Sequence, residues 1–207
     1  MIIIFLWSKL KPILTQNVKL KEVDLEYNRL KFNEIVFNSL LKNQDKITVN
    51  YLNIGIEIGD VNARYTLVKV CNPYCDPCSR AHYKLTDIIE NNKNIKVRII
   101  FNVSPNDEFA KKPVNLFLYY FKDAKKTETG LRILSKWHLQ NEKNYDEFIK
   151  AEKIDTSKIR QEYSDEIEKM YNWCKEMNVH STPTYFINDN KMPNFYLIEE
   201  INYFFIE

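Results

Sequence analysis

The spacing of apolar residues changes along the chain in a way that predicts alternating strands and helices. Residues 65–70 form a short run rich in Leu and Val, and the residues at 71–73 end it with an Asn-Pro turn. Apolar positions between residues 81 and 89 then recur at helical spacing. A second apolar run covers residues 95–103. Strand, helix and strand in this order predict a β-α-β unit, the core of an α/β domain.

The stretch after this unit predicts a helical insert over residues 105–180. Its candidate helices cover residues 112–122, 128–140, 145–152 and 157–177. The last has the clearest apolar stripe and follows a candidate cap at Asp155 or Thr156. Large aromatic residues of the insert are expected in its core or along a substrate groove: Phe109, Phe117, Trp137 and Trp173.

The C-terminal part of the chain predicts a β-hairpin and a closing helix. Candidate strands at 184–188 and 191–194 flank an Asp189-Asn190 turn. Apolar residues after position 197 then return to helical spacing.

The N-terminal region, residues 1–46, is expected to be separate from the domain at 47–207. One helical face would carry Val23, Tyr27, Leu30, Phe37 and Leu41, which predicts a single linker helix. Residues 47–58 alternate between apolar and polar, as an outer strand or hairpin would.

Length and composition bound the function. With 207 residues and 24.9 kDa, the chain suits one elaborated domain. A net charge of +2 gives no signal for nucleic-acid binding. Only 3 glycines and no glycine-rich phosphate loop argue against a nucleotide cofactor.

Cys75-Asp76-Pro77-Cys78, at the predicted start of the helix after the first strand, is the strongest chemical signal. Two cysteines separated by two residues stand one helical turn apart, so their sulfurs can form a disulfide. Unpaired N–H groups at a helix N-terminus favour a thiolate on Cys75, which would be the nucleophile. Cys78, further into the helix, would resolve the mixed disulfide with the substrate. These elements predict a thioredoxin-like fold.

Thr182-Pro183 precedes the predicted hairpin and is the second part of the candidate site. A cis proline facing the dithiol is expected there, because it would expose the backbone of Thr182 to an extended substrate.

These motifs resemble a known family. Asn72-Pro73-Tyr74-Cys75-x-Pro77-Cys78 with Ala81-His82, then Thr182-Pro183-Thr184-Tyr185-Phe186-Ile187-Asn188 and Pro193-x-Phe195-Tyr196, resemble one kind of bacterial thioredoxin-like domain. That domain is fused behind vitamin K epoxide reductase-like membrane domains. It is similar, more distantly, to periplasmic disulfide-bond oxidoreductases that carry a helical insert.

The resemblance implies a monomeric thiol-disulfide oxidoreductase that acts on protein cysteines and needs no metal or organic cofactor. A quinone-linked membrane domain of the vitamin K epoxide reductase type would recycle the dithiol. The protein would then lie outside the cytoplasm, in the periplasm.

The resemblance also makes the apolar residues 1–7 look like the tail of a transmembrane helix and a possible tether. Alone they are much shorter than the ~20 residues that span a bilayer. The lysines that follow at positions 9, 11, 19 and 21 favour a cytoplasmic side under the positive-inside rule, so a cytoplasmic location stays open. A buried strand or an anchoring helix end is the alternative interpretation of this run.

Two departures from the family pattern leave the direction of electron flow open. Asp76 stands where this family commonly has glycine, and its carboxylate would disfavour a thiolate on Cys75. Lys69 stands where thioredoxins have a buried acid, and its cation would favour the thiolate. Asp76, Pro77 and Lys69 are therefore the residues expected to tune the dithiol.

Other interpretations of the cysteines remain. Cys71, Cys75 and Cys78 have the spacing of an iron-sulfur triad, and with His82 they form a possible zinc set. A thioredoxin-fold module that only binds partners is a further alternative. Cys71 and Cys174 are expected to be buried thiols, or to form an auxiliary disulfide.

Overall fold

The computed structural model describes residues 2–159 and 163–205, and the chain divides into two units, residues 1–43 and 44–207. The first unit holds α1 (Ile2–Lys31) and α2 (Glu34–Lys42). The single linker helix predicted across this region is wrong. Asn33 separates the two helices, because its side chain accepts the N–H groups of Ile35 and Val36 and caps α2. Within the described residues, no helix combines the length and hydropathy needed to cross a membrane.

The second unit is built on a five-stranded sheet with the order β1-β3-β2-β4-β5. β2 and β3 are parallel, and the other neighbouring strands are antiparallel. The strands are β1 (Ile56–Ile58), β2 (Tyr65–Cys71), β3 (Ile95–Phe101), β4 (Thr184–Ile187) and β5 (Asn190–Lys191). The predicted alternation over 47–58 therefore yields a regular strand only at its end, and the hairpin strands are shorter than predicted.

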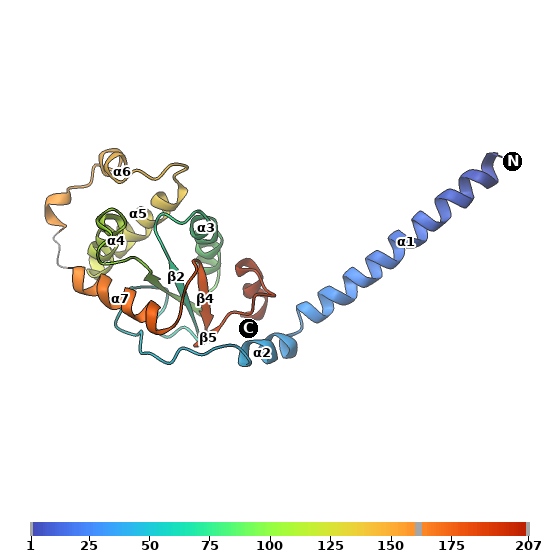
Figure 1. The fold of residues 1–207 in the computed structure, drawn as a ribbon, viewed down its shortest axis with the longest axis horizontal. Helices are drawn as coiled ribbons and strands as arrows, with labels where there is room; N and C mark the ends of the chain where they lie inside the picture. The colour runs from blue at the N-terminus through green and yellow to red at the C-terminus, as the bar shows by residue number, and fades with distance from the viewer. Residues whose placement is uncertain (1, 160–162, 206–207) are drawn as a thin grey trace. The chain divides into compact units, whose positions relative to one another are not determined.

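Helices cover both faces of the sheet (Figure 1). The register pairs Lys69 with Tyr185 and Val68 with Phe186, so these pairs point to opposite faces. α3 (Asp76–Asn91) lies on the Lys69 face, where the Lys69 ammonium reaches its backbone. α7 (Ser164–Glu176) lies on the other face, where Trp173 contacts the ring of Phe186. The start of α3 therefore contacts β2, the middle strand of the sheet.

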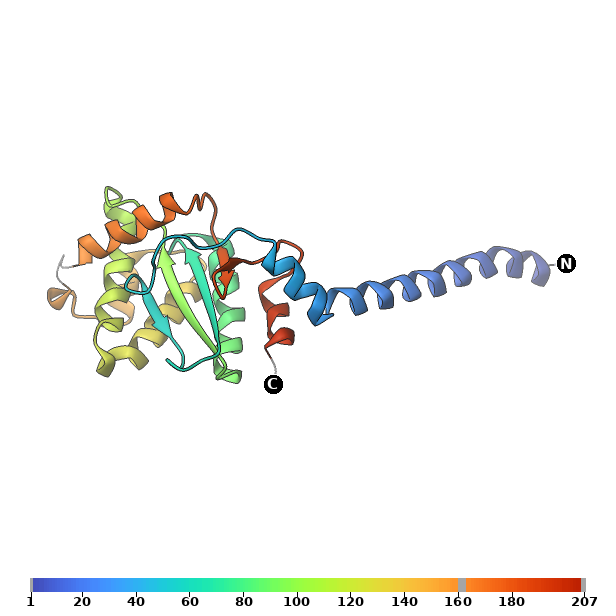
Figure 2. The same ribbon diagram turned by 90° about the horizontal axis from the view of Figure 1, so that it is seen from below.

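Along the chain, the helical insert follows β3 and precedes β4, as predicted (Figure 2). It comprises α4 (Glu108–Phe121), η1 (Ala124–Lys126), α5 (Thr127–Leu139), α6 (Tyr145–Ala151), η2 (Thr156–Lys158) and α7. The prediction of one helix over 157–177 is wrong. Asp155 caps only a short 3-10 turn, which ends at the extended Ile159, and α7 begins at Ser164. Residues 160–162 of that prediction lie outside the described residues.

The closing helix is also present, but it is a 3-10 helix, η4 (Ile198–Phe204), that packs against α3.

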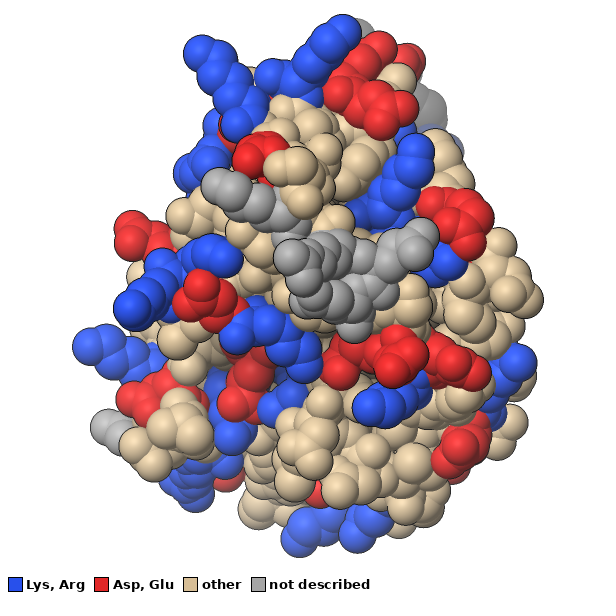
Figure 3. Space-filling view, turned by 90° about the vertical axis from the view of Figure 1, so that its left-hand side faces the viewer, with Lys and Arg blue, Asp and Glu red and all other residues tan. Residues whose placement is uncertain are grey.

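On the face of the molecule shown in Figure 3, acidic and basic side chains are interspersed among uncharged ones. That face therefore offers no broad field of one sign to a charged polymer.

Candidate active site

Cys75 is the N-cap residue of α3, with extended backbone angles before the first helical turn. Its sulfur accepts the backbone N–H of Cys78 at 3.3 Å, which satisfies one of the unpaired donors of the helix start. The side chain is partly exposed, and Asp76 and Pro77 of the first turn are exposed as well. A thiolate at this position would gain from the amide donors and from the helix dipole.

Cys78 is completely buried, one turn into α3. Burial is the largest cause that raises the pKa of its thiol, followed by the neighbouring Cys71. The two cysteines of the motif therefore differ in access: Cys75 can meet a substrate, whereas Cys78 can be reached only from within the site. All four cysteines of the chain lie among the described residues, and all are free thiols.

The loop before β4 brings Thr182 and Pro183 to the dithiol. The Thr182-Pro183 peptide bond is cis. The thiol of Cys75 donates to the carbonyl oxygen of Thr182 at 3.3 Å, although the two residues are 107 positions apart. Cys75 and the backbone before the cis proline are therefore in direct contact.

Lys69 is fully buried beneath the dithiol and points from β2 towards α3. Its ammonium donates to the carbonyl oxygen of Cys78 at 3.2 Å. Burial lowers the pKa of Lys69, while the thiols of Cys71, Cys78 and Cys75 oppose that shift. The thiols of three cysteines are therefore near this amine, and a thiolate formed on one of them would balance its charge.

The helical insert contacts the dithiol loop, residues 72–78 between the end of β2 and the first turn of α3, at two further points. Sequence reasoning missed both contacts. The indole N–H of Trp137 donates to the carbonyl oxygen of Pro73 at 2.9 Å, inside the core. The Lys143 ammonium lies 3.5 Å from the Asp76 carboxylate, and its side chain is only 5% exposed. Nothing in local spacing marks Lys143, because its role depends on how the insert folds back over α3.

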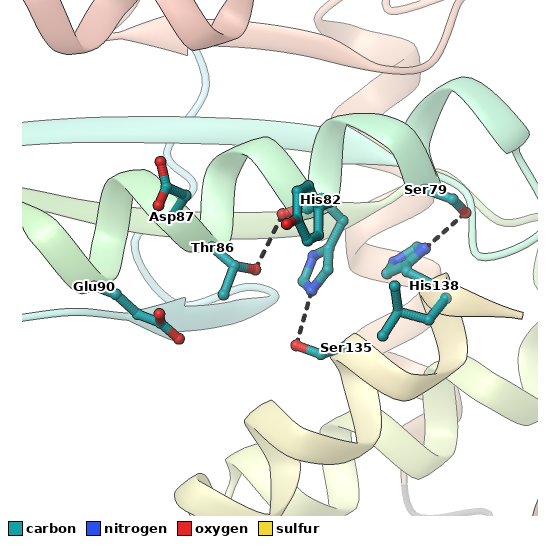
Figure 4. Close-up of a pocket in the computed structure, with 9 residues that line it drawn as sticks. Ser79, His82, Thr86, Asp87, Glu90, Ser135 and His138 are labelled. Atoms are coloured by element: carbon teal, nitrogen blue, oxygen red, sulfur yellow. Dashed lines mark hydrogen bonds between the residues drawn. The ribbon is translucent and has the colours of Figure 1, made fainter.

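Two buried histidines line a cavity of about 330 Å³ between α3 and α5 (Figure 4). His82 hydrogen-bonds Ser135 at 3.3 Å, and His138 hydrogen-bonds Ser79 at 3.0 Å. The two rings lie 4.6 Å apart. Burial lowers the pKa of His82 to about 3 and that of His138 well below its ordinary value, so both rings are neutral near pH 7. Their contacts are those of packed histidines.

The predicted aromatic groove is only partly present. Phe117, Trp137 and Trp173 are core residues. Phe109 is 57% exposed and stacks on Tyr74, with ring centroids 4.4 Å apart, so one exposed aromatic side chain lies beside the dithiol loop.

The remaining cysteines do not extend the site into a metal centre. Cys71 and Cys174 are buried, and burial raises the pKa of their thiols to about 11 and about 12. Among the described residues, no group of three or more His, Cys, Asp or Glu could hold a metal ion. The possible zinc set is therefore not assembled, and His82 instead contacts Ser135 and His138 of the insert.

Comparison with known proteins gives fold neighbours of low sequence identity. BdbD from Bacillus subtilis, in an oxidised form, has a TM-score of 0.58 at 16% identity, over 76% of this chain and 92% of its own. A periplasmic thioredoxin-like protein from Salmonella enterica serovar Typhimurium has 0.59 at 17%, over 81% and 96%. The catalytic domain of Proteus mirabilis ScsC has 0.61 at 16%, over 80% and 94%.

No curated protein matches the chain. The likeness to solved structures confirms the predicted α/β fold with its helical insert. The matches described here do not show the vitamin K epoxide reductase-like context that the motifs suggested. A family model described as thioredoxin matches residues 53–203. The chain therefore belongs to the thioredoxin family.

Proposed function

We propose that the protein is a thiol-disulfide oxidoreductase that acts on protein cysteines through Cys75 and Cys78. One observation carries the proposal: the partly exposed sulfur of Cys75 caps α3 and at the same time contacts the Thr182 carbonyl. A nucleophile in this position has amide donors on one side and a peptide backbone on the other. Membership of the thioredoxin family supports the same reaction class.

The reaction needs only sulfur chemistry. In the reducing direction, the Cys75 thiolate attacks a substrate disulfide, one substrate sulfur leaves with the bonding electron pair and takes up a proton, and a mixed disulfide remains. Cys78 then loses its proton and attacks the Cys75 sulfur, which forms the Cys75-Cys78 disulfide and releases the second substrate thiol. Oxidation of a substrate dithiol is the reverse sequence.

The supporting residues have separate roles in this proposal. The backbone of Thr182, before Pro183, would align an extended substrate beside Cys75. Pro77 fills the first turn of α3, and Lys69 would balance a thiolate formed within the site. Phe109 and Tyr74 would give the substrate an apolar surface next to its cysteine.

We place this activity outside the cytoplasm, as in the periplasmic thioredoxin-like protein from Salmonella. Protein thiols and disulfides would be the substrates, handled by a monomer. The apolar residues at the start of the chain would be the point of any membrane attachment, and a membrane redox protein of the vitamin K epoxide reductase type would be the recycling partner. Fractionation of cells that produce the full chain tests its location.

Trapping of the mixed disulfide tests the proposed reaction. The protein is incubated with a peptide that contains one disulfide, and covalent adducts are identified by mass spectrometry. Cys78→Ser should accumulate an adduct at Cys75, because the resolving thiol is missing, and Cys75→Ser should form none.

Cys174→Ser is the matched control, because Cys174 is a buried thiol on the other side of the sheet. It should exchange like the natural protein. An absence of adduct in Cys78→Ser, with a native far-ultraviolet spectrum, would leave only a binding role for the fold.

A further inference from the structure

The charges around the dithiol differ in how strongly water screens them. The side chain of Asp76 is 77% exposed, whereas that of its partner Lys143 is 5% exposed. Because the Lys143 side chain is covered and the Asp76 carboxylate is exposed, water screens the field of the ammonium less than that of the carboxylate.

The other groups at the dithiol add positive potential. Lys69 lies beneath it without exposure to solvent and bonds the carbonyl oxygen of Cys78. The N-terminus of α3 adds the partial positive charge of its free amide groups at Cys75. Asp76 is the charged residue inside the motif that acts in the opposite sense, and Lys143 is held against it.

We propose that Lys143 of the insert offsets the charge of Asp76 and so makes the Cys75-Cys78 pair an oxidant of protein thiols. This inference rests on the proposed function and assigns its direction. A positive potential stabilises the thiolate of the reduced pair over the neutral disulfide, and a pair with a stabilised reduced form is a stronger oxidant. Lys143 acts through its own field at the sulfur, which opposes that of Asp76, so it is a positioning residue.

Oxidation of the substrate needs only the Cys75-Cys78 disulfide and two substrate thiolates. A substrate thiolate attacks Cys75 of the oxidised pair, the Cys75-Cys78 bond breaks, and Cys78 takes the electron pair and a proton. A second substrate thiolate attacks the sulfur that is joined to Cys75, which releases Cys75 as a thiolate and leaves the substrate as a disulfide. The substrate loses two electrons and the protein gains them. Glutathione disulfide can reoxidise the pair in the assay.

Redox titration in glutathione buffers tests the role of Lys143. Lys143→Gln should shift the equilibrium constant for the pair towards the disulfide by about threefold or more, which is about 14 mV for a two-electron couple. Asp76→Asn should shift it the opposite way, and the double variant should return close to the natural protein.

Lys136→Gln is the control, because Lys136 is a half-exposed cation of α5 that pairs with Glu152 instead of the dithiol loop. It should leave the titration unchanged. An unchanged or more oxidising Lys143→Gln overturns the inference, and so does a double variant that matches Asp76→Asn.

Disulfide transfer tests the direction. Oxidised protein is mixed with an equal amount of a reduced peptide that has two cysteines, and the peptide disulfide is measured. Transfer to most of the peptide supports an oxidant. If the peptide stays reduced while the reduced protein instead cleaves the peptide disulfide, the assigned direction is wrong although the oxidoreductase proposal stands. If Cys75 and Cys78 form no reversible disulfide at all, the proposed function fails, and this inference fails with it.

Discussion

The indole N–H of Trp137 donates to the carbonyl oxygen of Pro73, two residues before Cys75. The tryptophan is fully buried and belongs to α5 of the insert, whereas Pro73 belongs to the turn that joins β2 to α3. The ring of Tyr74 packs edge-on against the same indole. The insert therefore packs against the dithiol loop through Trp137, in addition to covering the sheet.

Trp137→Phe should lower the free energy of unfolding by roughly 1–3 kcal/mol, because the buried carbonyl of Pro73 loses its donor. It should also slow thiol exchange, since the loop before Cys75 loses a support. Urea unfolding and the trapping assay measure the two effects. Trp173→Phe removes a comparable bond, from its indole to the carbonyl of Val49 at 3.1 Å, on the opposite face of the sheet. That control should lose stability but keep its exchange rate, and an equal loss of rate in both variants would contradict the role given to Trp137.

Lys69→Met should make the protein more stable and less reactive. Burial lowers the pKa of Lys69 from 10.5, so near pH 7 the unfolded chain binds this proton more tightly than the native state does, and stability suffers. Methionine of similar length removes that penalty, with a gain of roughly 1–3 kcal/mol in the free energy of unfolding. The gain should shrink as the pH rises towards 10.5, where the unfolded chain also loses the proton.

Urea unfolding between pH 7 and pH 10 measures the change, and thiol exchange is followed in parallel. Lys69→Arg is the comparison, because it retains a cation. A Met variant that exchanges as fast as the natural protein would show that the buried amine has no part in the reaction.

Acid should destabilise the protein through His82 and His138. Their pKa values are lowered by burial, that of His82 to about 3 and that of His138 well below its usual range, with Lys69 and the neighbouring ring adding to the effect. Above the unfolded value of 6.5 both rings are neutral in the folded and the unfolded state, so their titration does not change stability. As the pH falls below it, the unfolded chain takes up protons that the native state refuses, which costs at most about 1.4 kcal/mol per pH unit for each histidine.

His82→Gln keeps a possible hydrogen bond to Ser135 and removes one titrating group, so it should reduce the slope of stability against pH between 6.5 and 5. Urea unfolding at several pH values measures that slope. His180→Gln serves as the control, because His180 is exposed. Equal slopes in the natural protein and in His82→Gln would assign the acid sensitivity to other groups.

Alkylation of the folded, reduced protein should modify Cys75 first and almost alone. Cys71 and Cys78 have no exposed area and Cys174 has 1%, whereas Cys75 is partly exposed. A thiol must be both reachable and ionised to react. Iodoacetamide followed by peptide mass mapping should find one modified cysteine before unfolding and four after it. Early modification of Cys174 would reveal that α7 opens in solution.

The parts of the structure that sequence could predict are those in which local pattern and tertiary packing agree. β2, the redox turn and the start of α3 form one continuous segment, so Lys69, Cys75 and Cys78 could be related by spacing alone. β2 and β3 are largely buried on both faces, and the apolar residues that predominate in both strands reflect that burial. The contact between Cys75 and Thr182 followed only from the fold that these elements imply.

Other features could not be predicted, because they depend on single side-chain hydrogen bonds or on how the insert packs. Apolar spacing continues across Asn33, yet its side chain accepts the N–H of Ile35, caps a new helix and so separates the two helices. Asp155 likewise begins a short 3-10 turn where the apolar spacing predicts a longer helix. Lys143 reaches Asp76 from a loop, and its position depends on the packing of the whole insert. Trp137 was visible as a large residue on an amphipathic helix, but its bond to Pro73 was not.

The capping role of Cys75 links the redox state to the helix itself. Its sulfur accepts a hydrogen bond from the backbone N–H of Cys78, and a thiol or thiolate is a better acceptor than a sulfur in a disulfide. Oxidation should therefore weaken the first turn of α3 and speed hydrogen-deuterium exchange at the amide of Cys78. The exchange rate of that one amide would then report whether the cysteine pair is a dithiol or a disulfide.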